Sequence, residues 1–382
     1  MSTSVGAVTA STLDRVTISF ARGVPAPECL PVEELADCAK SALEHDGKTA
    51  LSYAGAGGYE PLRRWVAERH GVELGRVLLT NGSLQGFVFL AQHLLATGAR
   101  RVLVEAPTYD RPLKILAGLG AEVVALPLDE DGLDVEALER ELEAAAAPAF
   151  LYTIPTFQNP SGRTLSEERR RRLVEIARER GLLVLEDDPY GLVRFEAEPA
   201  PTLFELAGGD GVVYASSFSK TVAPGVRVGY LVLPDELARV VEAIAVSTYI
   251  SPVSLAEATV WEFIRRGSFE PNLARVNELL RTRRDAMLGA LERGLGGEAR
   301  WSRPEGGYFL WLDLPNGTDA AGLLERATQA GVTFVKGSDF FPDGRGGESS
   351  LRLAYSFVSP AEIETGIARL SALLPAPSAT AV

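Results

Sequence analysis

The chain has 382 residues, 46% of them hydrophobic and 23% charged, which is the composition of a folded protein with a large core. It carries 51 acidic against 38 basic residues, and the formal net charge of −13 disfavours nucleic acid or an anionic membrane as the main partner. Two cysteines (Cys29 and Cys38), three scattered histidines, no leader-like start and no long apolar run predict a cytoplasmic protein without a metal site or membrane span.

Short apolar runs alternate with amphipathic helical stretches from about residue 76 to residue 233. The expected strands are 76–80, 101–106, 121–127, 149–155, 182–188, 212–217 and 228–234. The expected helices follow residue 83, begin near Arg111, and include 134–145 and 166–180. Because the strands are apolar throughout, the pattern predicts an α/β fold with a mostly parallel seven-stranded sheet covered by helices on both faces. Ligands of such sheets bind in the loops at the strand ends.

The last third of the chain has a different pattern. A long helical region is expected at about 254–293, with a break at Pro271. Three strand-like runs and one helix follow: the runs at 306–315, 331–337 and 349–357, and the helix at 320–331. This mixture predicts a smaller α+β domain.

A capping box marks the start of the last expected helix. Ser359 and Glu362 have the required spacing, and a proline occupies the first turn. The helix completes a small domain of residues 266–382, which residues 1–45 are expected to join. The large domain then spans residues 46–265.

The most informative segment is SSFSKTVAPGVRVGY, at 216–230. A strand ends in serines, Lys220 follows at once, Pro224 and Gly225 make a turn, and Arg227 comes next. A lysine amine close to an arginine in a cleft has a lowered pKa and forms an imine with an aldehyde. A solvated surface lysine is the alternative, but it leaves the serines, the turn and the arginine unexplained.

This segment resembles the cofactor-lysine motif of fold-type I aminotransferases that use pyridoxal 5'-phosphate (PLP). Further motifs, in the order of that family, extend the resemblance from about Gly23 to Arg352. It is closest to the class I/II branch, which includes 2-aminoadipate, aromatic and kynurenine aminotransferases. The resemblance implies the large and small domains of that fold and a homodimer. Lys220 resembles the residue that forms the aldimine with PLP and later shuttles the proton.

Two motifs after strands resemble the residues that contact the PLP ring. Asn159 in NPSG matches the family asparagine that donates to the phenolate oxygen and also lies at the substrate. The acidic residues of EDDPY end a buried strand, where a carboxylate needs a cation such as the PLP pyridinium. The family spacing selects Asp187, with Tyr190 reaching the phenolate oxygen, and leaves Glu186 and Asp188 as solvated or capping carboxylates.

A second group of residues is expected to hold the phosphate. In TNGSLQG a strand leads into a helix, whose N-terminal amides suit a phosphate, although N-capping by Ser83 explains the same letters. The resemblance favours Ser217 and Arg227 as further donors to this dianion, with Ser219 less clearly matched. The phosphate contacts predicted together are Gly82, Ser83, Leu84, Ser217, Ser219 and Arg227.

The remaining matched residues concern ring stacking, the substrate and the second subunit. Tyr109 resembles the aromatic that stacks on the pyridine ring, and Tyr53 resembles the tyrosine that reaches the phosphate of the neighbouring subunit. Arg352 matches the arginine that binds the substrate α-carboxylate. Gly23 lies in the segment that closes over the substrate, where Arg22 is a candidate for a distal carboxylate or a plain surface arginine.

The resemblance implies transfer of an amino group between an L-amino acid and a 2-oxo acid, with 2-oxoglutarate and glutamate as one pair. The alternative is another PLP reaction, namely elimination, replacement, oxidation or C–C bond formation, because motifs that hold PLP do not fix which bond breaks. The S-x-x-K letters at Ser217 and Lys220 also fit a β-lactamase, but its S-D-N and K-T-G motifs are missing. The acidic charge and the early start of the motifs disfavour a DNA-binding regulator.

Overall fold

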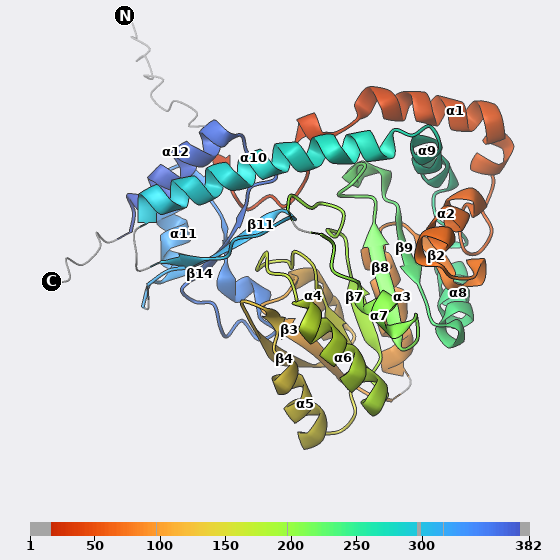
Figure 1. The fold of residues 1–382 in the computed structure, drawn as a ribbon, viewed down its shortest axis with the longest axis horizontal. Coiled ribbons are helices and arrows are strands. Elements are labelled where there is room, and N and C mark those ends of the chain that lie inside the picture. The colour runs from red at the N-terminus through yellow and green to blue at the C-terminus, as the bar shows by residue number, and fades with distance from the viewer. Residues whose placement is uncertain (1–16, 97, 197, 296–298, 316, 375–382) are drawn as a thin grey trace, which may run out of the picture.

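The computed structural model describes residues 17–374, apart from 97, 197, 296–298 and 316. A large part built on one long sheet lies beside a smaller part, and helix α10 runs along both (Figure 1). The helices are α1 (Val32–Ala50), α2 (Glu60–His70), α3 (Ser83–Ala96), α4 (Asp110–Gly118), α5 (Val135–Ala144), α6 (Glu167–Arg180), α7 (Leu203–Ala207), α8 (Asp235–Tyr249), α9 (Ser254–Arg265), α10 (Phe269–Leu295), α11 (Ala320–Gln329) and α12 (Pro360–Ser371). None of these described helices is long and apolar enough to cross a bilayer.

The large sheet is mixed, with a parallel centre. Its strands lie in the order β2 (Val77–Thr80), β9 (Gly229–Val232), β8 (Val212–Ser217), β7 (Val184–Asp187), β6 (Phe150–Thr153), β3 (Arg101–Ala106), β4 (Glu122–Asp129) and β5 (Gly132–Leu133). Neighbours from β8 to β4 are parallel, whereas β9 is antiparallel to β2 and β8. The predicted seven strands become eight, because Gly132, at φ +92°, turns the chain back and lets β5 pair with β4.

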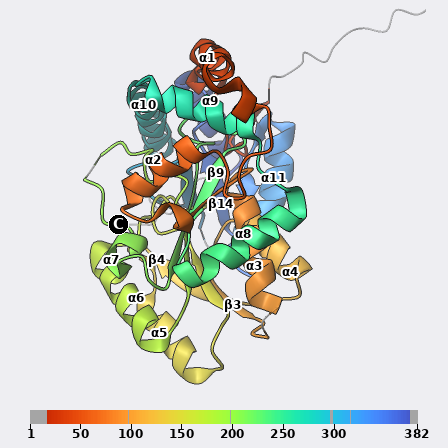
Figure 2. The same cartoon turned by 90° about the vertical axis from the view of Figure 1, so that its right-hand side faces the viewer.

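Helices cover both faces of this sheet, as the apolar strands predicted. Consecutive strand residues enter opposite clusters: Val184 and Val212 pack under α2, α5, α6, α7 and α9, whereas Leu185 and Val213 pack under α3, α4 and α8. Figure 2 shows α5, α6 and α7 on one side of the sheet and α3, α4 and α8 on the other.

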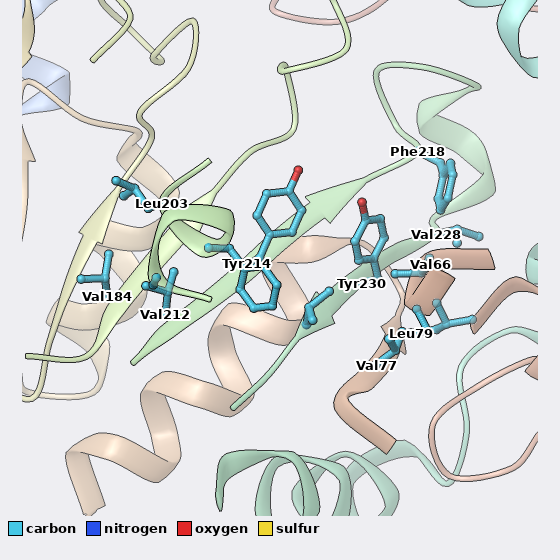
Figure 3. Close-up of a cluster of buried hydrophobic side chains, with 14 of the residues drawn as sticks. Val66, Val77, Leu79, Val184, Leu203, Val212, Tyr214, Phe218, Val228 and Tyr230 are labelled. Carbon is cyan, nitrogen blue, oxygen red and sulfur yellow. The ribbon is translucent and has the colours of Figure 1, made fainter. Parts of the chain in front are cut away.

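Figure 3 shows part of the first cluster. The rings of Tyr214 on β8 and Tyr230 on β9 lie side by side, between Leu203 and Phe218. Each fully buried aliphatic or aromatic side chain of such a core contributes about 1.5–3 kcal/mol. This packing holds the strand ends, and the loops that follow them, in fixed positions.

The smaller part is an α+β unit. Its antiparallel sheet has the order β10 (Arg300–Trp301), β11 (Phe309–Asp313), β14 (Ser350–Ala354) and β13 (Val335–Lys336), and β1 (Ile18–Ser19) pairs in parallel with β12 (Val332–Thr333). The predicted capping box is confirmed, because Ser359 Oγ accepts from Glu362 N and the Glu362 carboxylate accepts from Ser359 N. Side chains of α10, α11 and α12 pack on this sheet.

The predicted helix break at Pro271 is wrong in position. The chain leaves the helix at residues 266–268, between α9 and α10. Pro271 lies in the first turn of α10, where its missing N–H costs no intrahelical hydrogen bond. The break therefore precedes the proline.

Helix α1 departs from the expected packing of the N-terminal segment. Ile18 and Phe20 lie in the core of the smaller part, but Cys38 and Ala42 of α1 belong to the cluster of the large sheet, with α9. The domain limits at 45/46 and 265/266 stay a prediction. Residues 1–16 and 375–382, which that prediction assigned to the small domain, lie outside the described residues.

Candidate active site

A pocket of about 360 Å³ opens at the carboxyl edge of the parallel strands. β2, β3, β6, β7 and β8 end there, and the antiparallel β9 begins there, so the loops carrying the motifs meet at one edge. The predicted residues that line the pocket are Gly23, Gly82, Ser83, Leu84, Tyr109, Asn159, Asp187, Tyr190, Ser217, Ser219, Lys220, Arg227 and Arg352.

Two predicted residues do not line this pocket. Tyr53 follows α1 and is 79% exposed. The Arg22 guanidinium lies 4.0 Å from the centre of the Phe357 ring, on the surface of the smaller part. A contact of Arg22 with substrate stays a prediction, as does the contact of Tyr53 with a second subunit.

Lys220 follows β8 and lies between the two parts of the molecule. Its Nζ donates to the Gly23 carbonyl at 3.0 Å and lies 4.8 Å from the centre of the Tyr308 ring. Burial, together with the positive charges of Arg352 and Arg227, lowers the pKa of Lys220 to about 8. With this lowered pKa, a substantial fraction of the Lys220 amine is neutral near pH 8, and the neutral amine is the form that acts as nucleophile and base.

Asp187 is the member of the acidic run that faces the pocket. Side chains alternate along β7, so Leu185 and Asp187 share the pocket face and their neighbours point the other way. Asp187 Oδ2 accepts from the Tyr152 hydroxyl at 2.8 Å, whereas Oδ1 is buried and has no partner among the described residues. Burial raises the pKa of this carboxyl to about 7.

The other two carboxylates cap backbone amides, as predicted, but neither is solvated. Glu186 is fully buried, accepts from the first two amides of α7 and lies 4.0 Å from Arg170 Nη1. Asp188 accepts from the Tyr214 hydroxyl at 2.9 Å and from Gly191 N at 2.8 Å. They face the side of the sheet covered by α6 and α7, where the chain supplies their partners.

The phosphate motifs meet beside the N-terminus of α3. Gly82 takes φ +90°, and a Cβ there would collide with the Arg227 guanidinium, so only glycine lets the two approach. Arg227 donates to Ser219 Oγ at 3.4 Å and to the Asn81 carbonyl at 3.2 Å. Ser217 Oγ donates to Ser219 Oγ at 2.8 Å. Helix amides, hydroxyls and a guanidinium thus converge in a form that suits a phosphate.

Arg352 on β14 enters the pocket from the smaller part. Nη1 donates to Asn159 Oδ1 at 3.0 Å and Nη2 donates to the Ala21 carbonyl at 2.9 Å. The rings of Phe309 and Phe340 lie 4.3 and 4.9 Å from the guanidinium carbon. Nε is buried without a partner among the described residues, and none of their carboxylates forms an ion pair with Arg352. The guanidinium therefore lacks the anion that a buried cation needs.

Sequence reasoning missed several residues of the pocket. Tyr152 lies in an apolar run. Its contact with Asp187 requires β6 and β7 to be neighbours in the sheet, and the sequence alone does not give the order of the strands. Phe309 and Phe340 look like core residues in the sequence, although Phe309 lines the pocket and both contact Arg352. The hydroxyl of Tyr152, placed near the end of an otherwise apolar strand, is the one signal that the sequence offered.

Comparison with known proteins identifies the family. Residues 20–370 match the family model described as aminotransferase class I and II. This chain belongs to that family. The aminotransferase is therefore a PLP-dependent transferase that moves an amino group between an amino acid and a 2-oxo acid, as the motifs predicted.

Two relatives and one solved structure resemble it over most of their lengths. A 2-aminoadipate transaminase of Thermus thermophilus is 41% identical, covering 94% of this chain and 90% of that protein. An aromatic-amino-acid aminotransferase of Thermococcus litoralis is 35% identical, covering 93% and 87%. The crystal structure of a Thermus thermophilus alpha-aminoadipate aminotransferase, complexed with N-(5'-phosphopyridoxyl)-L-leucine, has a TM-score of 0.88 at 40% identity and covers 94% and 92%. The fold is that of fold-type I aminotransferases, as predicted.

The pocket of the aminotransferase fits PLP. The cofactor has an anionic phosphate, a basic ring nitrogen and an aldehyde. The donors around Gly82 and Arg227 suit the phosphate, the unpartnered oxygen of Asp187 suits a protonated ring nitrogen, and the amine of Lys220 suits the aldehyde. None of these three contacts uses Arg352, whose Nε has no partner among the described residues.

Proposed function

We propose that the aminotransferase holds PLP covalently on Lys220, between Asp187 at the ring nitrogen and the Gly82–Arg227 turn at the phosphate. The observation that carries this proposal is the coincidence in one pocket of a lysine amine of lowered pKa and a buried carboxylate with one free oxygen. Ser83, Leu84, Ser217 and Ser219 complete the phosphate contacts.

Each remaining residue of the pocket then has a role that its contacts permit. Asn159 accepts from Arg352 through Oδ1, which leaves its amide nitrogen to donate to the cofactor phenolate oxygen. Tyr190 is buried in the same wall and donates to that oxygen as well. Tyr109, half-buried at the start of α4, provides a flat face for the ring.

The chemistry follows from these positions. When bound, PLP supplies a ring that accepts electrons from the substrate Cα. Lys220 Nζ takes the Cα proton as general base and returns a proton at the cofactor carbon C4′. Asp187 keeps the ring nitrogen protonated through its negative charge. Arg352 binds the α-carboxylate and so directs the Cα–H bond toward the lysine.

The test of this arrangement is chemical trapping. The protein loaded with PLP is reduced with borohydride, digested, and mapped by mass spectrometry. We expect one modified peptide, which contains Lys220. An adduct on another lysine, or none at all, would overturn the assignment.

We further propose glutamate and 2-oxoglutarate as one substrate pair. Besides Arg227 at the phosphate turn, the pocket is lined by Arg352 and the 60%-exposed Arg111, one for each carboxylate of a dicarboxylic substrate. A related protein is named for 2-aminoadipate, which is also dicarboxylic. The loaded enzyme should convert its cofactor from the aldehyde to the amine form at least about tenfold faster with glutamate than with glutamine. Equal rates with the two amino acids would contradict this choice.

We also propose a homodimer with shared active sites, at a cytoplasmic location. Exposed apolar side chains gather on α1 and in the segments after α1 and α8, where a second copy would cover them: Val32, Leu51, Tyr53, Ile250 and Val253. In this dimer Tyr53 reaches the phosphate of its partner. Tyr53→Ala and Lys220→Ala chains, each impaired alone, should therefore regain activity when mixed, because one site of each hybrid is intact. No gain on mixing, or a monomer by light scattering, would overturn the shared site.

A further inference from the structure

The buried tyrosine behind Asp187 has no role in the cofactor site as described so far. Tyr152 lies on β6, next to β7, and is 1% exposed. Its hydroxyl donates to Asp187 Oδ2 at 2.8 Å. Within the described residues this is the one hydrogen bond that the Asp187 carboxylate receives, so Tyr152 alone constrains its orientation.

Packing fixes the ring that carries this donor. Tyr152 meets the edge of Phe87, from α3, with ring centres 5.4 Å apart and planes at 73°. Tyr152 and Phe87 both line the pocket and belong to the cluster under α3 and α4. Because the ring is held on this side, its hydroxyl has a defined position and occupies one carboxylate oxygen only.

We propose that Tyr152 is a positioning residue for the cofactor: it holds Asp187 Oδ2 and leaves Oδ1 free for the protonated ring nitrogen of PLP. The inference rests on the proposed function, in which Asp187 is the partner of that nitrogen. Tyr152 touches Asp187 and acts through it.

The electrostatics of the site give the hydroxyl a second effect. Burial raises the pKa of Asp187, the Tyr152 hydroxyl opposes that rise, and Asp188 and Glu105 add to it. No arginine or lysine of the described residues forms an ion pair with Asp187. A hydrogen bond donated to a carboxylate favours its ionised form. The Tyr152 hydroxyl therefore lowers the pKa of Asp187 relative to a site without it, and Asp187 stays anionic down to a lower pH.

The next residue along β7 provides a matched control. Asp188 accepts from the Tyr214 hydroxyl at 2.9 Å, and Tyr214 is also buried, but this pair faces the opposite side of the sheet. Tyr152→Phe and Tyr214→Phe each remove one hydroxyl that donates to a buried carboxylate at the same strand end. Their losses of stability should therefore be similar, and only their effects on the pocket should differ.

The experiment measures the Kd of PLP for the cofactor-free protein between pH 6 and pH 9, for the wild type and both variants. Lys220 titrates in all three proteins, so differences between them report on Asp187. We expect Tyr152→Phe to weaken binding about tenfold near pH 7, since a hydrogen bond to a charged group is worth that much or more. We also expect its pH profile to move to higher pH, while Tyr214→Phe keeps the wild-type profile.

A PLP analogue with CH in place of the ring nitrogen distinguishes loss of the Asp187 contact from a general loss of cofactor binding. It should bind the wild type and Tyr152→Phe equally, because it offers Asp187 no proton. If Tyr152→Phe does not fold, a fluorinated tyrosine at position 152 keeps the ring and donates more strongly, and the profile should then move to lower pH.

Two failures are distinguishable. If PLP binds the wild type on Lys220 but Tyr152→Phe and Tyr214→Phe share one pH profile, the role of Tyr152 is overturned and the proposed function stands. If PLP does not join Lys220 in the wild type, the proposed function fails and the inference fails with it.

Discussion

The carboxylates on the two faces of β7 differ in how many hydrogen bonds they receive. On the side of α6 and α7, Glu186 and Asp188 each receive two hydrogen bonds from the chain itself. On the pocket side, Asp187 receives one, from Tyr152, and its second oxygen has no partner among the described residues. Since unpaired buried polar atoms are costly, an oxygen without a partner on the pocket side indicates a ligand, whereas a satisfied one indicates support for the fold.

Two buried arginines repeat this contrast. Arg170, on the side of α6 and α7, donates to the carbonyls of Leu165, Pro155 and Pro201 and to Thr156 Oγ1, near the Glu186 carboxylate. Arg352, on the pocket side, donates to two neutral oxygens and keeps Nε free. The first arginine is occupied by the chain, and the second is available to a substrate.

The largest effect is expected for the residue on which the pocket side depends. Lys220→Ala removes both the amine that holds the cofactor and the base, so turnover should fall by at least about 10³-fold, within the range for lost acid–base catalysis. Lys40→Ala, an exposed lysine of α1, is the control and should keep wild-type activity. Steady-state kinetics of both variants provide the measurement. Substantial turnover by Lys220→Ala would contradict the claim that the residues on the pocket side carry catalysis.

On the side of β7 covered by α6 and α7, a substitution should lower the free energy of unfolding. Arg170→Leu leaves the buried Glu186 carboxylate without its nearby cation and frees four oxygen acceptors, so the free energy of unfolding should fall by about 3–5 kcal/mol. Urea unfolding followed by circular dichroism measures it. A loss below about 1 kcal/mol, the size of a surface ion pair, would show that Arg170 contributes little to the free energy of unfolding.

The same substitution on the pocket side should act on catalysis. Arg352→Leu should lower kcat/KM for amino acids about 10- to 100-fold, because a hydrogen bond to a charged group contributes roughly 1.5–3 kcal/mol. Its free energy of unfolding should fall by less than that of Arg170→Leu, because the guanidinium has no carboxylate partner among the described residues and gives up two hydrogen bonds instead of four. Amines without a carboxylate are the control substrates, and their slow reaction should be equal in both proteins. A matching drop with such amines would contradict a carboxylate-binding role.

The smallest effect concerns a carboxyl that is unpartnered but lies outside the pocket. Glu257 of α9 is 1% exposed, accepts from Tyr59 N at 2.8 Å through Oε2, and has no partner for Oε1 among the described residues. Burial raises its pKa from 4.5 to about 8. We therefore expect it to keep its proton in the folded state at neutral pH, because the effect of burial outweighs that of the nearby Arg63 charge and no cation of the described residues forms an ion pair with it.

The sign of the pH dependence follows from this proton. Between about pH 4.5 and pH 8 the unfolded chain releases it and the folded chain retains it, so rising pH lowers the stability of the wild type. Glu257→Gln cannot titrate. From pH 6 to pH 7 the free energy of unfolding of the variant should gain on that of the wild type by at most about 1.4 kcal/mol. A difference that stays constant over this pH unit would mean that Glu257 is already ionised.

Much of the fold could be predicted from the sequence because its strands are continuous apolar runs. β8 begins and ends at the expected residues, 212–217, and the Ser359 capping box forms as its letters predict. The two-residue strands β5 and β10 were missed, since pairs this short have no periodicity. Their formation depends on the neighbouring strand that each one joins.

The site divides in the same way. Lys220 and Asn159 follow β8 and β6, so their arrival at one sheet edge follows from the parallel order, whereas Arg227 reaches that edge because the antiparallel β9 begins there. The choice of Asp187 over its neighbours came from the resemblance, and the alternation of β7 supplies its physical reason. The hydroxyl of Tyr152 was visible in the sequence, but its partner Asp187 was not, because the contact crosses from one strand to the next. Tyr53 lies outside the pocket of its own chain, and its contact with the site of a second chain stays a prediction.

The reversal of β9 has one more consequence. Because this strand runs against β8, the chain leaves the sheet after Ser217 and re-enters it at Gly229 on the same edge, and Lys220 and Arg227 both lie in that single connection. The spacing between the amine and the guanidinium is thus set within this connection, which α10 also holds because Asn272 Nδ2 donates to the Thr221 carbonyl at 2.9 Å. Lengthening this connection by one residue would misalign the two ends of a rigid cofactor, whereas a longer loop at the far edge, between α5 and β6, would leave their separation unchanged.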